Sequence, residues 1–263
     1  MNKRVVIWSD MHCGHRAGLT PPGWQYQAES SDAELAKFAK HQALTWDFVT
    51  RKIDELKPID ILIVNGDLVE GKGEKSGATE LIVADRQKQA EMAAECIKYV
   101  GAKNTIITYG TPYHGGVTED FENDVAKEVK ADKIGGHEWL DVNGVVFDCK
   151  HRIASSSIPH GRHTAPARDV LWNFLWALEE EGQPKSDIFI RSHVHYFTYA
   201  GTNRYFVVTT PALLGWGCKY GTRICSGIIN YGFLHFDVAG KGDWTWKAHI
   251  LNAKPGGELL LKL

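Results

Sequence analysis

Short apolar runs recur along the chain, and polar or glycine residues follow each one. Runs of this length indicate buried β-strands. We expect strands at residues 3–9, 60–65, 104–109, 187–191 and 204–210, a hairpin over 137–150, and a closing strand pair at 232–238 and 244–250. Asn143-Gly144 is a strong turn signal within the hairpin, and a glycine-rich turn separates the closing pair.

Helical spacing of apolar residues appears between these strands. After a glycine- and proline-rich loop at 13–30, Ser31-Asp32 offers an N-cap to a long helix that Pro58 ends. Further helices are expected over 79–100 and 165–181. The last of these is rich in tryptophan, which we interpret as core rather than as a base-stacking platform. Alternating strands and helices in the first half imply a parallel sheet with crossover helices.

Aspartate and histidine residues follow five of the apolar runs, at the point where each run ends. They occur in Asp10-Met11-His12, Gly66-Asp67, His114, His151 and His193-Val194-His195. Open α/β sheets place their ligands at the carboxyl ends of strands, so these side chains are expected to share one site. Carboxylate and imidazole groups bind metals. The sequence therefore predicts a metal site assembled from five loops.

The order of these segments resembles the calcineurin-like metallophosphoesterase family, in the small form of phage and bacterial genomes. The family pattern is Asp-x-His, Gly-Asp-x-x-(Asp/Glu), Gly-Asn-His, a lone His and Gly-His-x-His. The matching segments are residues 10–12, 66–70, 110–114, 151 and 192–195, with Ser192 in place of the last glycine. The third segment departs most, because it reads Gly110-Thr111-Pro112-Tyr113-His114.

The resemblance spans residues 5–195 and implies an α/β fold of two packed mixed β-sheets flanked by helices. The β-rich second half, added to an α/β first half, agrees with this arrangement. We expect one domain over residues 1–263, because no linker-like stretch interrupts the chain.

The resemblance also implies ligands for two divalent metal ions. One metal would be held by Asp10, His12 and His195 and the other by His151 and His193, with Asp67 bridging them. Mixed oxygen and imidazole donors favour manganese, with iron, zinc or nickel as alternatives. Glu70 matches the acidic position of the family, and both a supporting and a surface role remain open for it.

The departing third segment leaves two alternatives for His114. The family's histidine lies near the scissile oxygen, which implies that His114 is the general acid for the leaving group. A different alignment makes His114 a metal ligand, and we favour the acid role. The family's asparagine is a metal ligand, so Thr111 becomes a candidate for metal or substrate contact through its hydroxyl or backbone oxygen.

A loop rich in serine, histidine and arginine at residues 155–168 is the best candidate for contact with substrate phosphate. Its candidate substrate-binding residues are His160, Arg162, His163 and Arg168.

Composition narrows the possible functions. The 30 basic and 32 acidic residues give a net charge of −2, so no global basic character indicates nucleic-acid binding. No apolar stretch approaches the roughly 18 to 20 residues of a membrane span, and no signal-peptide core is present. Five cysteines without Cys-x-x-Cys spacing indicate reduced thiols. We expect a cytoplasmic protein without a membrane partner.

The resemblance implies a metal-dependent hydrolase of phosphoesters, in particular a phosphodiesterase acting on a small molecule or a nucleic acid. A nuclease of the same family is one alternative, and a non-catalytic metal-binding scaffold for a partner protein is another. Scaffold members typically lose ligands, whereas here every segment except the asparagine is intact. The oligomeric state is not predicted.

Overall fold

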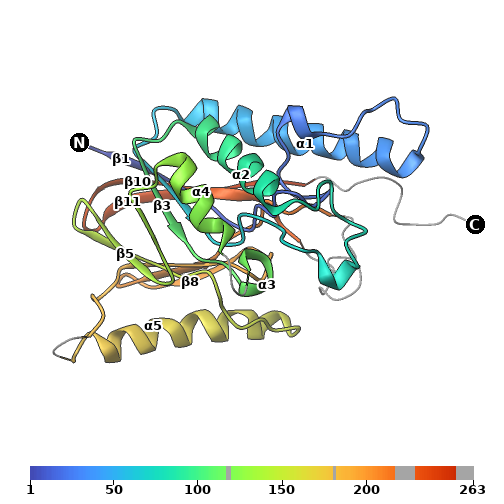
Figure 1. Cartoon of the computed structure of the whole chain (residues 1–263). Helices are drawn as coiled ribbons and strands as arrows, with labels where there is room; N and C mark the ends of the chain where they lie inside the picture. Colours follow the sequence, from blue (N-terminus) through green and yellow to red (C-terminus); the bar gives the residue numbers. More distant parts are fainter. Residues whose placement is uncertain (117–119, 180–181, 217–228, 253–263) are drawn as a thin grey trace, which may run out of the picture.

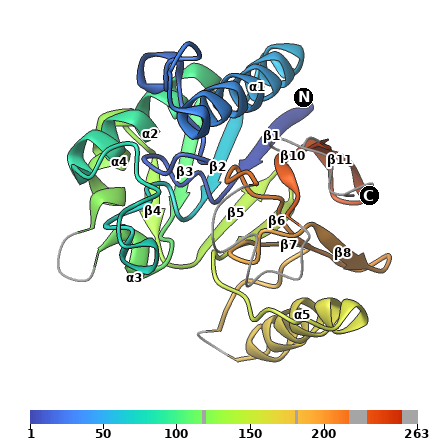
Figure 2. The same cartoon turned by 90° about the vertical axis from the view of Figure 1, so that its right-hand side faces the viewer.

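The structure is a computed structural model, and it describes residues 1–116, 120–179, 182–216 and 229–252. Two mixed β-sheets pack face to face, and helices cover their outer sides (Figures 1 and 2). The predicted fold class is therefore confirmed. None of the helices in these ranges is long and apolar enough to cross a membrane.

The first sheet holds the parallel strands that the sequence predicted as neighbours. Within the described ranges its order is β11-β10-β1-β2-β3-β4. The bounds are β1 Lys3–Trp8, β2 Ile61–Asn65, β3 Asn104–Thr108, β4 Lys133–Gly135, β10 Tyr231–Gly240 and β11 Asp243–Leu251. Strands β1 to β4 run parallel, and the predicted closing pair β10–β11 lies antiparallel beside β1.

The second sheet has the order β5-β6-β7-β9-β8 in the described part of the chain. Its strands are β5 Glu138–Val142, β6 Val145–Cys149, β7 Ile188–Arg191, β8 Thr198–Gly201 and β9 Phe206–Thr209. The predicted hairpin is confirmed as β5–β6. Asn143 and Gly144 at its turn have φ of 54° and 83°, as a two-residue hairpin turn with two left-handed residues requires.

Buried side chains on both faces of β1 explain why its sequence is continuously apolar. Val5 and Ile7 face the second sheet and belong to the core between the two sheets. Val6 and Trp8 face the other way and pack in the core under the helices.

The helices are α1 Ala33–Leu56, α2 Arg86–Val100, α3 Pro112–Gly115, α4 Phe121–Val129 and α5 Thr164–Trp176, with short 3-10 helices at Pro22–Trp24, Glu74–Ser76 and Pro159–His163. Asp32 caps α1 as predicted, because its carboxylate accepts hydrogen bonds from two backbone N–H groups. Helix α2 begins later than the expected residue 79, because Asp85 is the residue that caps it. Helix α4 was not predicted.

Helix α5 lies alone on the outer side of the second sheet, whereas α1, α2 and α4 lie over the first (Figure 1). Val170 packs against Phe189 and Val207 of that sheet. The expectation that the tryptophans of this helix are core is wrong, because Trp172 and Trp176 point away from the sheet and are half exposed. The helix ends at Trp176, before the expected residue 181, and residues 180–181 lie outside the described ranges.

Candidate metal centre

The six predicted ligands meet where strands of both sheets end. Their donor atoms form two groups, and within each group the atoms lie within 4.8 Å of one another. One group is Asp10, His12 and His195, and the other is Asp67, His151 and His193. A third group contains His12, Asp67 and His114. His12 and Asp67 therefore each belong to two groups, and these two residues link the donor atoms into one site.

Short distances show that the two groups are adjacent. Nε2 of His195 lies 3.1 Å from Oδ1 of Asp10, and Nε2 of His151 lies 3.0 Å from Oδ2 of Asp67. His151 also reaches across, with its Nε2 4.0 Å from Oδ1 of Asp10. The two groups of donor atoms are therefore neighbours within one site and not two separate sites.

The backbone at this site is unusual. Five of the six predicted ligands have positive φ, with values of 50°, 45°, 52°, 73° and 55° for Asp10, His12, Asp67, His193 and His195. Residues other than glycine seldom adopt this conformation, which costs about 1–3 kcal/mol each and is concentrated at functional sites. Residues 193–195 are therefore not extended chain, although two histidines two residues apart after a strand would suggest it. The left-handed turns send the two histidines into different groups.

Two motif glycines allow the ligand loops to approach one another closely. A Cβ on Gly66, whose φ is 81°, would lie 2.5 Å from the ring of His151. A Cβ on Gly110 would lie 2.2 Å from the backbone N and Oδ1 of Asp67. Any larger residue at either position would displace a predicted ligand.

Hydrogen bonds behind the histidines fix which ring nitrogen faces the site. Nδ1 of His12 lies 2.8 Å from Oε2 of Glu70, and Nδ1 of His151 lies 2.7 Å from the backbone oxygen of Asn65. Both rings therefore present Nε2 to the centre, as metal-binding histidines do. Glu70 has a supporting role behind His12.

The donor set fits a divalent metal. Nε2 of His12 is buried and has no hydrogen-bond partner among the residues that the structure describes. Buried polar atoms are normally bonded, so an atom of this kind needs another partner. Two carboxylates and several imidazoles around it are the donors that manganese, iron and zinc accept.

Thr111 and His114 lie at the same centre. Thr111 donates to Oδ1 of Asp67 twice, from its backbone N at 2.6 Å and from its Oγ1 at 3.1 Å. Nδ1 of His114 lies 2.8 Å from the backbone oxygen of Glu70. The ring of His114 lies edge-on to that of His12, with centroids 4.5 Å apart.

Charge in this cluster is balanced between carboxylates and imidazoles. Burial alone would raise the pKa of Asp10, but His195 and His151 outweigh it and lower that pKa to about 2. Burial would lower the pKa of His151, but Asp67 outweighs it and raises that pKa to about 10. The carboxylates therefore stay ionised and are available as ligands.

Part of the expected phosphate-contacting loop touches the segment that follows His195. The guanidinium of Arg162 lies 4.3 Å from the ring centroid of Tyr196, the residue after His195. Nδ1 of His163 lies 3.2 Å from Oγ1 of Thr198. His160 and Arg168 are exposed, and the structure joins neither to a described site residue by a hydrogen bond or ion pair.

Two supporting residues were missed. Glu122 of α4 accepts hydrogen bonds from the backbone N–H of Leu68 at 3.1 Å and of Gly110 at 2.7 Å, and so joins two ligand loops. Burial, with Asp67 adding to it, raises the pKa of Glu122 to about 8. Glu122 was missed because it stands among other acidic residues in the sequence, a pattern that is typical of an exposed helix. Asn65 was signalled only by being polar at the end of an apolar run.

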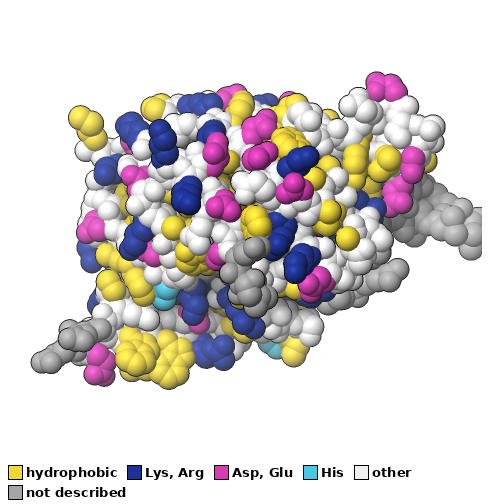
Figure 3. All heavy atoms as spheres, viewed as in Figure 1, with side chains coloured by type: hydrophobic (Ala, Val, Ile, Leu, Met, Phe, Trp, Pro, Cys, Tyr) yellow, Lys and Arg dark blue, Asp and Glu magenta, His cyan; other side chains and the backbone are white. Residues whose placement is uncertain are grey.

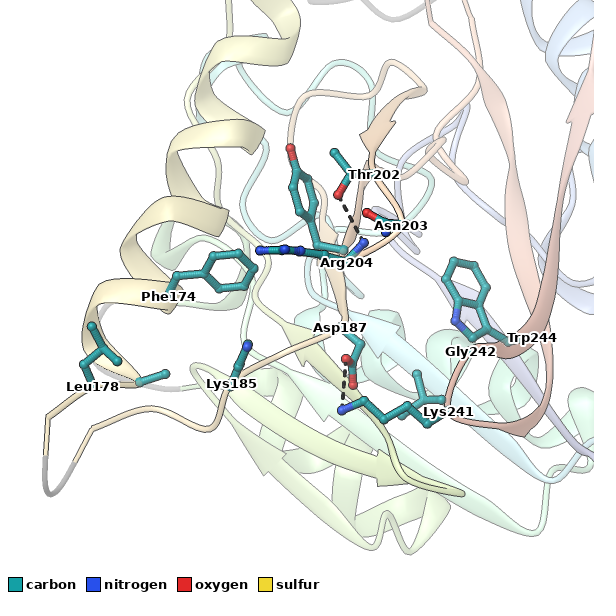
Figure 4. Close-up of a pocket in the computed structure, with 13 residues that line it drawn as sticks. Phe174, Leu178, Lys185, Asp187, Thr202, Asn203, Arg204, Lys241, Gly242 and Trp244 are labelled. Carbon is teal, nitrogen blue, oxygen red and sulfur yellow. Dashed lines mark hydrogen bonds and ion pairs between the residues drawn. The ribbon is translucent and has the colours of Figure 1, made fainter.

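A cavity of about 610 Å³ lies away from this centre (Figure 4). It is lined by Phe174, Lys185, Arg204 and Trp244, among others, and by residues at the starting ends of β6 and β7. None of the six predicted ligands lines it. It is not the metal centre.

The sequence matches no protein-family model and no curated protein. Among solved structures, Vps29 from Chaetomium thermophilum is 11% identical with a TM-score of 0.48, covering 90% of this chain and 86% of that one. Wild-type Vps29 from Entamoeba histolytica complexed with Zn²⁺ is 11% identical, with a TM-score of 0.45 and coverage of 94% and 98%. An archaeal phosphodiesterase is 12% identical, with a TM-score of 0.45 and coverage of 93% and 99%. Similarity at this level supports no conclusion about chemistry.

Proposed function

We propose that this chain is a metal-dependent phosphoesterase that acts as a phosphodiesterase. The observation that carries the proposal is the meeting of two carboxylates and four imidazoles, from five segments spread along the sequence, in two adjacent groups. The two groups would each hold one divalent ion, and Asp67 of one group is the proposed bridge to the other. Manganese is favoured, with iron, zinc or nickel as alternatives.

The residues of the chain have distinct roles in this proposal. When bound, a metal pair supplies Lewis acidity and an activated water for attack on phosphorus. Thr111 donates to Oδ1 of Asp67 and so fixes the carboxylate that is the proposed bridge. Glu70 orients His12, and Asn65 orients His151.

His114 is the proposed general acid. A backbone carbonyl only accepts hydrogen bonds, so Nδ1 of His114 carries a proton where it faces the oxygen of Glu70. Its Nε2 is then free to hold and deliver a proton to the leaving oxygen. The ring lies edge-on to that of the proposed ligand His12, which places it beside the proposed metals. Its donor atom is also close enough to those of His12 and Asp67 for the alternative role as a ligand.

The substrate is proposed to be a phosphoester contacted by Arg162 and His163, which lie beside the segment after His195. Contacts from His160 and Arg168 and a cytoplasmic location stay predictions. The presence of all six predicted aspartate and histidine ligands favours catalysis over the non-catalytic scaffold.

The test is hydrolysis of bis-p-nitrophenyl phosphate by protein stripped of metal and reloaded with Mn²⁺. We expect metal-dependent cleavage of this diester that exceeds cleavage of p-nitrophenyl phosphate. His195→Ala should abolish it, whereas His235→Ala on β10, outside the centre, should not. Protein that binds two metals and hydrolyses no mono- or diester with Mn, Ni, Zn or Mg would contradict the proposal in favour of a scaffold.

A further inference from the structure

The outer face of α5 carries large apolar side chains that nothing in the described structure covers. Leu171, Trp172, Leu175 and Trp176 are 58%, 54%, 47% and 50% exposed. Hydrophobic side chains gather along the lower edge of the molecule in Figure 3, where Figure 1 places α5. Contiguous apolar patches of this kind mark interaction sites on folded proteins.

These residues form one continuous stripe. Leu171 and Leu175 are four residues apart, as are Trp172 and Trp176, so each pair lies on one side of the helix. The opposite side is already packed, because Val170 contacts the second sheet. An ion pair of 2.8 Å between Asp169 and Arg191 fixes the helix to that sheet. The stripe therefore cannot turn inward to bury itself.

The ends of the stripe carry opposite charges. Arg168 lies one turn before Trp172, and Glu179 lies just beyond Trp176, where the sequence continues with two more glutamates. Both are exposed, and neither has an ion pair within the described ranges. Neither charge lies where the helix dipole acts most, because Arg168 is the fifth residue of α5 and Glu179 lies three residues beyond its end. Its own helix does not account for these charges.

We propose that this face of α5 binds the same face of a second copy, with the two helices antiparallel about a two-fold axis. In a two-fold contact, when residue i of one copy faces residue j of the other, residue j of the first copy also faces residue i of the second. An axis midway between residues 173 and 174 sets Trp172 opposite Leu175 and Leu171 opposite Trp176. The same axis brings Arg168 toward the turn that follows the partner's α5, which carries Glu179. Both apolar pairs and the charge pair are thus satisfied by one placement.

The apolar area of the stripe indicates how tightly the two copies would bind. A half-exposed tryptophan offers about 100 Å². Two of these with the leucines give several hundred Å² per copy, less than the roughly 800 Å² per partner of a standard interface. We therefore expect a dimer whose population rises with concentration. None of the six predicted metal ligands lies on α5, so the dimer does not depend on the proposed metal centre, and Arg168 is the one predicted substrate contact that it shares.

The apolar part is tested by sedimentation velocity over a wide range of protein concentration. Wild-type protein should pass from monomer to dimer. Trp172→Ser should raise the dissociation constant by about tenfold or more, because interface tryptophans are commonly hot spots. Leu44→Ser, at an equally exposed leucine of α1, should leave it unchanged. Circular dichroism checks that each variant is folded.

The antiparallel arrangement is tested by charge exchange. Arg168→Glu and Glu179→Arg should each weaken self-association, because each sets like charges opposite one another. Mixing these two variants should produce a heterodimer, visible by native mass spectrometry, because both cross-contacts become attractive again.

A wild-type protein that stays monomeric would overturn the proposal, and vesicle binding lost in Trp172→Ser would then assign the face to a lipid surface. A dimer that survives Trp172→Ser would place the interface elsewhere. Failure of the two charge variants to pair would exclude the antiparallel arrangement.

Discussion

At the residue scale, several constraints meet at Asp67. Its φ is 52°, it belongs to two donor groups, and Thr111 fixes one of its oxygens. Gly110 is close enough that no larger residue fits there without moving Asp67. Such a position is costly for the fold and is explained by a role that only this carboxylate can fill.

Replacing Asp67 with alanine should remove metal and activity together. The proposed bridge would be lost, while the fold should survive because Asp67 follows β2 rather than lying inside it. Elemental analysis of metal content measures the effect, with circular dichroism as the test of folding. Asp47→Ala, at an exposed aspartate of α1, is the matched control and should retain both metals. A folded, active Asp67→Ala protein with two metals would rule out the dinuclear centre.

His114→Ala separates the two roles proposed for this histidine. A general acid contributes typically 10²- to 10⁴-fold to rate, and most where the leaving group must be protonated. The variant should keep its metals, lose most activity on an alkyl phosphodiester and lose much less on a nitrophenyl ester. Equal loss on both esters, together with loss of one metal, would instead identify His114 as a ligand.

At the scale of elements, a buried charge network holds α5, β6 and β7 together. Arg191 of β7 lies 2.7 Å from Asp148 of β6 and 2.8 Å from Asp169 of α5. His137 lies 2.7 Å from the same oxygen of Asp148. Breaking one partner of a buried pair leaves a charge without compensation, which costs about 3–5 kcal/mol.

Asp148→Asn should therefore lower the free energy of unfolding by about 3 kcal/mol at neutral pH. Burial alone would raise the pKa of Asp148, but His137 and Arg191 outweigh it and lower that pKa below 3.8. The ionised carboxylate thus stabilises the fold above pH 3.8, and this contribution is lost as the pH falls through the folded-state pKa. The variant has no carboxyl group to titrate at this position, so its free energy of unfolding should fall correspondingly less as the pH is lowered.

Urea unfolding at neutral and acidic pH measures both effects. Asp237→Asn is the control, because its pair with Arg4 is partly exposed and should contribute at most about 1 kcal/mol. Equal destabilisation by the two variants would show that the network does not act as a buried unit.

The strands that sequence patterns predicted most directly are those that are buried on both faces. Strands β1, β2 and β3 are apolar on both faces, so their runs are continuous. Strand β4 has three residues and β8 alternates at a sheet edge with little burial, so neither produces an apolar run. The face of α5 was recognised as apolar, but a pattern does not say whether such a face meets the chain's own core or another surface.

The sequence predicted those site residues that directly follow strands. The six ligands follow strands, and their order along the chain indicated that they belong to one metal site. Glu122 and Asn65 act by joining backbone segments that are distant in sequence. Asp and His are enriched in the left-handed conformation, but too weakly to predict it at these five ligands, where the surrounding fold imposes it.

At the scale of the whole molecule, the centre joins the two sheets. Asp10 and Asp67 follow strands of the first sheet, whereas His151 and His193 follow strands of the second. Metal held by both sets would cross-link the sheets at the edge where their strands end. The unfolded chain cannot assemble these ligands, so metal binding should stabilise the folded state.

Adding Mn²⁺ to metal-free protein should therefore raise its melting temperature, and chelation should reverse the change. A ligand at 100 times its dissociation constant stabilises by about 2.7 kcal/mol, provided that it binds only the folded state. Differential scanning fluorimetry across a Mn²⁺ titration measures the shift. Asp67→Ala should show little shift, whereas Asp47→Ala should behave as wild type. An equal shift in Asp67→Ala would mean that the stabilising metal binds elsewhere, because loss of the shared carboxylate must weaken a centre that spans both sheets.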